Sequence, residues 1–394
     1  MWISRDLAAT LRGFANEYPV VCLTGARQTG KTSLMRNTFP TAGYVSLDSP
    51  SKAVTAVERP EDFVDGLSTP VILDEVQYAP ELFRFLKDRV DADRTTTGKY
   101  LLTGSQQFAL MRGLSESLAG RVAVLELDSL SAREWLRYCS EQKITHGDLE
   151  FVWRGGFPEL WIRPSLKPVE FYGNYTATYL ERDLRQIVDV GNLRDFDRFL
   201  RALAVRNAQL LNYADLARDI GISQDTVRRW VSALEASQLV YILEPYATNP
   251  TKRLVKTPKL YWRDTGLLCF LLGLRSVEAM RDSALVGAIW ETAVFNQILR
   301  ARASLGRWRG VYFYRDAHGV EVDFLLEETN GIRLVEAKWT EAPGPNAWGS
   351  QEKVAKALGA AVLPEFWIAC RARDAYWPSG HVRAFPGLAW ERWG

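Results

Sequence analysis

Histidine and cysteine are scarce in this sequence. There are 3 histidines and 4 cysteines among 394 residues. The cysteines form no CxxC pair, and closely spaced pairs are what disulfide frameworks and small zinc sites require. We therefore expect no disulfide framework and no zinc site, and a histidine-rich metal site is disfavoured as well. The cysteines are Cys22, Cys139, Cys269 and Cys370.

Long apolar runs are absent too. No run approaches the roughly 18 residues that a membrane-spanning helix needs, and the first residues lack the apolar core of a secretory signal. Instead Ile3, Leu7, Leu11 and Phe14 are spaced three or four apart, which predicts an amphipathic helix. We expect a cytoplasmic protein with no membrane partner.

Neither sign of charge is in large excess. The chain has 49 basic and 47 acidic residues, a net charge of +2 at pH 7. Contact with DNA or RNA is therefore neither required nor excluded, and would depend on a local basic patch. Hydrophobic residues make up 47% and charged residues 24%, a globular composition that excludes a mainly disordered chain.

Apolar runs divide the chain into three parts. In residues 1–150, short runs alternate with helical patterns, which predicts a parallel sheet covered by helices. Residues 151–275 have a mostly helical pattern. Residues 276–394 begin with a helix over 287–300 and continue with strands. The predicted strands are Val20–Thr24, Gly43–Leu47, Val71–Leu73, Tyr100–Thr103, Val122–Leu127, Val311–Tyr314, Val320–Leu326 and Leu334–Ala337.

Residues 25–32 match the phosphate-binding pattern GxxxxGK[ST] between a predicted strand and a predicted helix. Glycines let backbone N–H groups point at phosphates, and the helix N-terminus adds positive dipole character. Lys31 is expected to reach the β- and γ-phosphates of ATP, and Thr32 to ligate Mg²⁺. The alternative is a chance glycine-rich turn. The predicted nucleotide-binding residues are Gly25, Ala26, Arg27, Gln28, Thr29, Gly30, Lys31, Thr32 and Ser33.

Two acids, Asp74 and Glu75, end the predicted strand 70–73. In P-loop NTPases an acid at this place holds Mg²⁺, which we expect of Asp74. Glu75 is then placed to activate the attacking water as a general base. The alternative is a solvated acidic turn at the end of a strand.

Two further residues are candidates for the same site. Ser105 follows a strand and could place its hydroxyl near the γ-phosphate or the water, with Thr103 the less favoured choice. Arg121 could supply positive charge to the transition state, from the same chain or across the boundary of a homo-oligomer. The alternatives are a plain turn for Ser105 and a structural ion pair for Arg121.

Residues 213–230 have helix-turn-helix spacing, with Gly221 at the turn and Ser223 as a candidate N-cap. The apolar residues 240–243 suggest a following β-hairpin, and therefore a winged helix. Basic and aromatic residues could contact phosphates and stack on bases, while the alternative is a lid or packing module. They are Arg228, Arg229, Tyr246, Lys252, Arg253, Lys256, Lys259, Tyr261, Trp262 and Arg263.

Carboxylates form a second pattern in the last part. Asp323 and Glu336 fall on strands joined by a turn, and Lys338 shares the face of Glu336 because strand side chains repeat every two residues. This is the PD-(D/E)XK arrangement of nucleases, in which carboxylates bind Mg²⁺ and the lysine positions a water. Glu291, on the preceding helix, is a candidate additional ligand. The alternatives are a charged pair at a sheet edge and a nuclease fold that no longer cuts.

Together these stretches resemble a prokaryotic family of AAA-type P-loop ATPases that carry a C-terminal restriction-endonuclease-like domain of uncharacterised function. The resemblance implies an ASCE-type α/β core with Glu75 as its catalytic acid, then a winged-helix domain and a nuclease-like α/β domain. The matching stretches are LTGARQTGKTSL, VILDEVQYAPEL, YLLTGSQQFALM, SLAGRV, GGFPEL, KTPKLYWRDTGL, GAIWETAVFNQIL, VEVDFLLEE and LVEAKW.

The sequence therefore predicts an enzyme that binds and hydrolyses Mg-ATP and that acts on nucleic acid or is regulated by it. Two alternatives stay open. One is an ATP-regulated, metal-dependent nuclease, with a role in defence as one possibility. The other is a signalling ATPase that does not cut and binds a protein partner.

Overall fold

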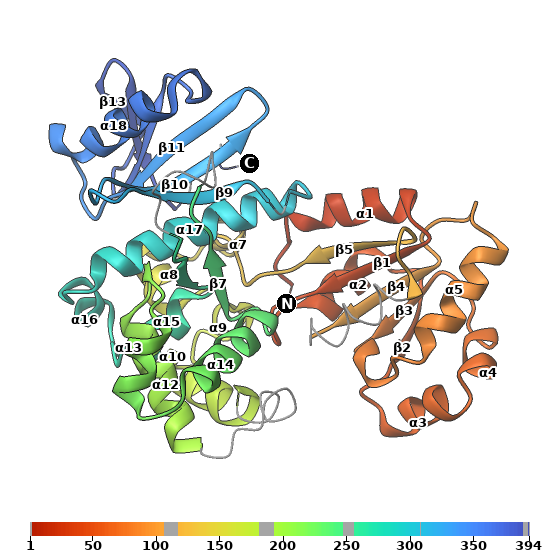
Figure 1. Ribbon diagram of the computed structural model, residues 1–394. Coiled ribbons are helices and arrows are strands. Elements are labelled where there is room, and N and C mark those ends of the chain that lie inside the picture. Colours follow the sequence, from red (N-terminus) through yellow and green to blue (C-terminus); the bar gives the residue numbers. More distant parts are fainter. Residues whose placement is uncertain are drawn as a thin grey trace.

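The structure is a computed structural model that describes residues 2–105, 117–180, 193–246, 256–307, 309–388 and 393. Its amino-terminal part, its green middle part and its blue carboxyl-terminal part lie around the long helix α17 (Val286–Ser304) (Figure 1). Within the described ranges, no helix combines the length and apolar character needed to cross a membrane.

A five-stranded parallel sheet forms the amino-terminal part, with the strand order β2-β3-β4-β1-β5. All five strands were predicted from the apolar runs. Helices α1 (Leu7–Glu17) and α2 (Lys31–Thr38) pack on one face. The other face is covered by α3 (Pro50–Glu58), α4 (Pro60–Asp65) and α5 (Leu82–Ala92). The strands are β1 (Val20–Thr24), β2 (Gly43–Ser46), β3 (Val71–Asp74), β4 (Tyr100–Gly104) and β5 (Val122–Glu126).

The strand order positions the predicted nucleotide site. Strand β4 lies between β1 and β3, so the carboxyl ends of these three strands are neighbours at one edge of the sheet. The P-loop follows β1, Glu75 follows β3, and Ser105 follows β4. Residues far apart in the sequence therefore meet at this edge, as the ASCE-type core implied by the resemblance requires.

The middle part is mostly helical, as predicted. Gly221 ends α13 in the left-handed conformation with φ 85°, and the Ser223 side chain caps α14 by accepting from the Thr226 N–H. The predicted hairpin is also present as antiparallel β7 and β8, with β6 at the edge. The middle part is longer than predicted, because α7 and α16 share its core through Trp135 and Met280. Its helices are α7 (Ala132–Gln142), α8 (Asp148–Arg154), α9 (Pro158–Ile162), α10 (Pro168–Tyr175), α12 (Leu193–Val205), α13 (Tyr213–Ile220), α14 (Gln224–Ala236), α15 (Thr265–Leu271) and α16 (Val277–Arg281). The strands are β6 (Gln209–Leu210), β7 (Val240–Leu243) and β8 (Lys259–Trp262).

The carboxyl-terminal part is a six-stranded mixed sheet in the order β13-β14-β12-β11-β10-β9. Helix α17 packs on one face and α18 (Gly349–Leu358) on the other. The sequence predicted α17 and the first three strands, but not α18 or the last three strands. The strands are β9 (Val311–Arg315), β10 (Glu321–Glu328), β11 (Gly331–Ala337), β12 (Phe366–Cys370), β13 (Tyr376–Ser379) and β14 (Val382–Pro386).

One hydrophobic core runs through the middle part into the carboxyl-terminal part. It joins Trp135 of α7, Trp230 of α14 and Trp262 of β8 to Phe295 of α17 and Phe324 of β10. The amino-terminal sheet has two cores of its own, one on each face. Apolar packing therefore binds the last two parts together more closely than it binds either to the ATPase sheet.

Candidate functional site

The P-loop forms the turn between β1 and α2. A side chain at Gly25 would place its Cβ 2.3 Å from the Leu127 carbonyl oxygen, so only glycine fits there. Lys31 is 5% exposed, and its Nζ donates to the carbonyl oxygens of Gly25 and Ala26 at 2.9 Å each. Burial lowers the pKa of Lys31 to about 8, although Glu75 and other nearby carboxylate charge oppose that shift.

Asp74 is held by three hydroxyl groups. The Thr32 Oγ1 donates to Asp74 Oδ1 at 2.8 Å, and the Tyr44 hydroxyl donates to Oδ2 at 2.9 Å. The Thr103 hydroxyl also donates to Oδ1. The structure thus brings together Thr32 and Asp74, the two residues predicted to hold Mg²⁺ with ATP. A hydroxyl and a carboxylate are oxygen ligands that suit Mg²⁺.

Tyr44 and Thr103 both hold Asp74 in place. The sequence analysis gave Tyr44 no role and favoured Ser105 over Thr103. Tyr44 lies on the edge strand β2, and its pKa is raised by burial and by the hydrogen bond to Asp74. Thr103 also accepts a hydrogen bond from the Glu75 backbone N–H at 3.1 Å. Its hydroxyl therefore connects the two acids, and no local pattern in the sequence marks either residue for this role.

Glu75 begins a sharp turn after β3. Its backbone is left-handed, with φ 59° and ψ 49°, which is uncommon for a residue other than glycine. The Ser105 hydroxyl donates to Glu75 Oε2 at 2.9 Å, and the Gln77 side-chain amide donates to the same oxygen. Ser105 therefore lies beside the predicted general base, whereas Gln77 had no role in the sequence analysis.

Arg121 lies at the amino ends of the strands, whereas the P-loop lies at their carboxyl ends. It directly precedes β5, whose first residue pairs with Val20 at the start of β1, so it is at the amino ends of the strands. Its guanidinium makes a two-pronged ion pair with Asp91 on α5, at 2.7 and 3.0 Å. This placement corrects the expectation that Arg121 serves the P-loop of its own chain, because the P-loop is at the carboxyl ends.

The middle part contacts the nucleotide edge through buried polar residues. Arg263, just after β8, pairs with Asp128 at 2.8 Å and with Glu126 at 3.3 Å, both beyond or at the end of β5. Gln238, between α14 and β7, lies with its Nε2 3.5 Å from Thr24 Oγ1, at the end of β1. The end of the P-loop strand is thus in contact with the middle part.

The same contacts correct part of the expected basic surface over residues 252–263. Lys259 is buried and the Arg263 side chain is only 10% exposed, and both are held in ion pairs with acids of this chain, whereas Lys256 is exposed. Tyr261 and Trp262 are fully buried, so neither can stack on a base. Lys252 and Arg253 lie outside the described residues. Arg228 and Arg229 of α14 remain exposed.

Asp264 explains two of the motifs that carried the family resemblance. Its carboxylate accepts hydrogen bonds from the Ser129 hydroxyl, the Gly156 N–H and the Tyr172 hydroxyl, at 2.7 to 2.9 Å. It also caps α15. A Cβ at Gly155 would lie 2.2 Å from the Tyr172 oxygen, so the chain must be glycine there. The buried hydrogen bonds of Asp264 therefore join the stretches GGFPEL and YWRDTGL.

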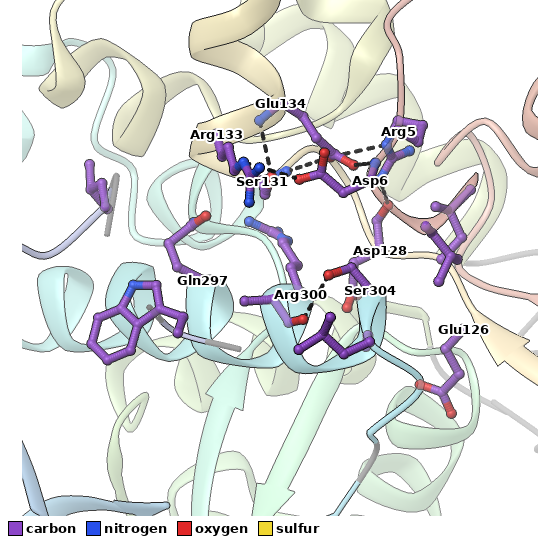
Figure 2. A pocket seen from close by; sticks show the side chains of 17 residues that line it. Arg5, Asp6, Glu126, Asp128, Ser131, Arg133, Glu134, Gln297, Arg300 and Ser304 are labelled. Carbon is purple, nitrogen blue, oxygen red and sulfur yellow. Dashed lines mark hydrogen bonds and ion pairs between the residues drawn. The ribbon is translucent and has the colours of Figure 1, made fainter. Parts of the chain in front are cut away.

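A cavity of about 170 Å³ lies near the Asp264 hydrogen bonds, between the amino-terminal segment, the end of β5 and α17 (Figure 2). Arg5 lines it, and the Arg5 guanidinium donates to the carbonyl oxygens of Thr29 in the P-loop and Asp128. Arg5 also pairs with Glu134 at 3.0 Å, and Arg300 of α17 donates to the Ser129 hydroxyl at 2.8 Å. These contacts tie the P-loop to both later parts of the chain.

The nuclease-like acids come together as predicted. Strands β10 and β11 are antiparallel with Phe324 opposite Val335, which places Asp323 beside Glu336. The Lys338 Nζ is 2.6 Å from Glu336 Oε2 and 3.9 Å from Asp323 Oδ2. Burial and the Asp323 charge raise the pKa of Glu336 well above its ordinary value.

A lysine from the middle part also enters this cluster. Lys259 of β8 is 2% exposed, and its Nζ lies 3.1 Å from Glu291 Oε1 and 2.5 Å from Glu321 Oε1. The Tyr261 hydroxyl donates to the same Glu291 oxygen at 2.6 Å. Burial and the charge of Asp323 raise the pKa of Glu291 to about 7.

Lysines pair with these acids in the structure. Lys259 is bound to Glu291 and Glu321, and Lys338 is bound to Glu336. Among the described residues, no three or more histidine, cysteine, aspartate or glutamate side chains are arranged to hold a metal ion. That Glu291, Asp323 and Glu336 hold Mg²⁺ stays a prediction.

The chain matches three known families. The family described as "AAA domain" covers residues 17–136. "Domain of unknown function (DUF8612)" covers residues 149–278, and "Domain of unknown function (DUF4143)" covers residues 286–386. The first match contains the P-loop, both acids and Ser105, so this part of the chain is an AAA-type P-loop ATPase domain.

Two solved structures are similar at low identity. The Walker-type ATPase PABY2304 of Pyrococcus abyssi is 17% identical, with a TM-score of 0.46, over 68% of this chain and 96% of that one. A single-residue variant of RuvB from Thermotoga maritima is 19% identical, with a TM-score of 0.29, over 60% of this chain and 85% of that one. Neither likeness is close enough to bear on function.

Two curated relatives match along most of the chain. They are the uncharacterized proteins Rv2008c of Mycobacterium tuberculosis (strain ATCC 25618 / H37Rv) and Mb2031c of Mycobacterium bovis (strain ATCC BAA-935 / AF2122/97). Each is 34% identical over 345 residues, which is 86% of this chain and 74% of the relative. The chain therefore belongs to the family of these mycobacterial proteins, and it joins an AAA-type P-loop ATPase domain to a C-terminal DUF4143 domain.

Proposed function

We propose that this protein hydrolyses Mg-ATP at the P-loop and uses the cycle to move its last two parts against the ATPase sheet. The observation that carries the proposal is the hydrogen-bonded chain Thr32–Asp74–Thr103–Glu75–Ser105. It joins residues at or beyond the carboxyl ends of β1, β3 and β4, and it links the predicted metal ligands to the backbone of the predicted base through the Thr103 hydroxyl.

Each residue has a separate role in this proposal. Lys31 and the backbone N–H groups of the P-loop hold the β- and γ-phosphates. When ATP binds, the Lys31 ammonium donates to phosphate oxygens in place of the two loop carbonyl oxygens. Thr32 and Asp74 would hold Mg²⁺, which would neutralise the charge that develops on the phosphates. Glu75 takes one proton from water while the water oxygen bonds to the γ-phosphorus. The bond from that phosphorus to the bridging oxygen breaks, so that ADP and inorganic phosphate leave.

The contacts between the parts support the proposed coupling. Gln238 touches the end of the P-loop strand, and Arg263 is paired with the acids at the end of β5. A change in the P-loop on hydrolysis would therefore reach two residues that flank the hairpin of β7 and β8. Lys259 on the same hairpin is paired with the carboxyl-terminal sheet.

Nucleic acid is a second element of the proposal, and the exposed arginines of α14 support it. Arg228 stacks over the Tyr213 ring at 4.4 Å and Arg229 lies beside it on the helix, both exposed to solvent. Contact with phosphates would make binding salt-dependent. The nuclease alternative is less favoured, because Lys259, a lysine outside the nuclease pattern, is paired with Glu291, the candidate additional ligand.

ATP turnover by the purified protein tests the first proposal. We expect Mg²⁺-dependent release of phosphate, lost in Lys31→Ala together with nucleotide binding. Wild-type protein that binds ATP and releases no phosphate, with or without nucleic acid, would overturn it.

Binding of labelled DNA and RNA tests the second element. Reversing both arginines, Arg228→Glu with Arg229→Glu, should weaken binding and flatten its dependence on salt. The matched control reverses Arg198 and Arg201, two exposed arginines of α12. Equal losses in both variants would refute a specific role for α14.

Cleavage of the same nucleic acids, with Mg²⁺ or Mn²⁺ and with or without ATP, tests the nuclease alternative. We expect no cut product. Cleavage that Asp323→Ala abolishes would restore that alternative.

A further inference from the structure

Gln77 lies two residues beyond the proposed base and is folded back onto it. The left-handed backbone of Glu75 leads into the single turn of 3-10 helix η1 (Val76–Tyr78). This turn places the Gln77 amide nitrogen in hydrogen-bonding contact with Glu75 Oε2, and 3.2 Å from the Ser105 hydroxyl oxygen. The three side chains form a closed triangle in which Ser105 also donates to Glu75.

The triangle fixes the orientation of the Gln77 amide. Its nitrogen is the donor, because ionised Glu75 can only accept and Ser105 donates its own proton to Glu75. The amide oxygen, Oε1, therefore points away from the triangle. It is buried and accepts no hydrogen bond from any residue that the structure describes.

A buried acceptor without a donor needs an explanation, because it lowers the free energy of unfolding by about 1–3 kcal/mol. A water molecule would satisfy it. The Gln77 amide that would hold this water is itself bonded to the Glu75 carboxylate, the group proposed to accept the proton of the water. Glutamine amides orient the attacking water in GTPases in a comparable way.

We propose that Gln77 positions both the base and the water during ATP hydrolysis, an inference that rests on the proposed ATPase activity. Its N–H donor holds Glu75 Oε2, and its Oε1 accepts from the hydrogen of the water that Glu75 does not take. Gln77 exchanges no proton. The proton passes from water to Glu75 while the new oxygen–phosphorus bond forms and the bond to the ADP oxygen breaks.

Steady-state ATP hydrolysis by Gln77→Met tests this role. Methionine has a similar length but neither donates nor accepts at these positions, so kcat should fall about 10-fold to 100-fold. KM and the affinity for a non-hydrolysable ATP analogue should change less than about threefold, since neither depends on the water. The matched control is Gln209→Met, the same change at an exposed position of β6, which should leave kcat unaltered.

A second variant keeps the test valid if Gln77→Met does not fold. Gln77→Asn retains the amide but is one methylene shorter, and it should lose kcat to a similar extent. In a Glu75→Gln background, Gln77→Met should cause no further loss, because Gln77 acts through that carboxylate and its water.

The possible failures can be told apart. If the wild type hydrolyses ATP and Gln77→Met keeps its kcat within threefold of the wild type, this inference alone is overturned. A loss of analogue binding in parallel with kcat would mean that Gln77 only supports the fold of the site, which also overturns it. Absence of turnover in the wild type would overturn the proposed function and this inference with it.

Discussion

Replacing Lys31 with methionine is expected to make the nucleotide-free protein more stable while it abolishes ATP binding. The Lys31 ammonium is buried in the P-loop, and its nearest partners are two carbonyl oxygens at 2.9 Å. Methionine fills a similar volume without carrying a charge. The variant therefore removes a desolvated cation and adds none of the strain that a larger side chain would bring.

The size of the effect follows from the pKa of Lys31, which burial lowers from 10.5 to about 8. Below pH 8 the lysine is protonated in both the folded and the unfolded chain, and the folded chain carries the full cost, about 3 kcal/mol. Between pH 8 and 10.5 the folded form loses its proton first, so the cost shrinks. Above pH 10.5 both forms are neutral and the cost is gone.

Thermal unfolding of nucleotide-free protein at pH 7 and at pH 10 measures the effect. At pH 7 the transition of the ATPase part should rise by about 6–12 °C in Lys31→Met, given about 2–4 °C per kcal/mol for a part of this size. At pH 10 the gain should be much smaller. ATP at 100 times its dissociation constant should then stabilise only the wild type, by about 2.7 kcal/mol.

Lys52→Met, at an exposed position of α3, controls for the loss of a positive charge and should show no such dependence on pH. Equal or lower stability of Lys31→Met at pH 7 would refute the reasoning. A gain in stability of the same size at both pH values would also refute it.

Three further outcomes follow from the described contacts. Glu75→Gln should bind ATP normally but lose turnover by about 100-fold or more in a phosphate-release assay, and near-wild-type turnover would remove Glu75 as the base. Lys259→Met should lower the free energy of unfolding by about 3–5 kcal/mol at pH 8, because it leaves Glu291 and Glu321 without their buried partner. That loss should be smaller at pH 5.5, where Glu291, whose pKa is raised to about 7, is protonated; an equal loss at both pH values in urea unfolding would contradict it. Arg121→Ala should keep ATP turnover within twofold of the wild type while it lowers the melting temperature, and a large loss of turnover without loss of stability would point to a role across a subunit boundary.

The ATPase sheet could be predicted from the sequence because its signals are local. Each buried parallel strand is a short apolar run, and the P-loop is one continuous stretch with a defined spacing. Asp74 and Glu75 end one such run, so their place at the edge of the sheet follows from strand direction alone. Ser105 could be found in the same way.

The partners of these residues could not be predicted, because partner choice depends on tertiary packing. Tyr44 comes from an edge strand with no motif, and Gln77 reaches Glu75 only because the backbone turns left-handed between them. Arg121 looked catalytic from its sequence neighbours, whereas its ion pair with Asp91 is formed by a helix far away in the chain.

The carboxyl-terminal acids illustrate the same limit. The hairpin pattern correctly placed Asp323 beside Glu336, since strand register follows from the turn and the alternation. Lys259 was read as part of a solvent-exposed basic stretch, because a run without acids resembles a nucleic-acid surface. Lys259 is buried against Glu291 because β8 packs on α17. This packing cannot be predicted from residues 252–263 alone.

The continuous core described above has a consequence for cooperativity. Because one set of apolar contacts joins Trp230 of the middle part to Phe324 of the last sheet, neither side can unfold without exposing the other. Chemical denaturation should therefore show two cooperative units, the ATPase sheet and everything after it. Under the proposed function, ATP hydrolysis would therefore move this second unit as one body, because its two parts share that core.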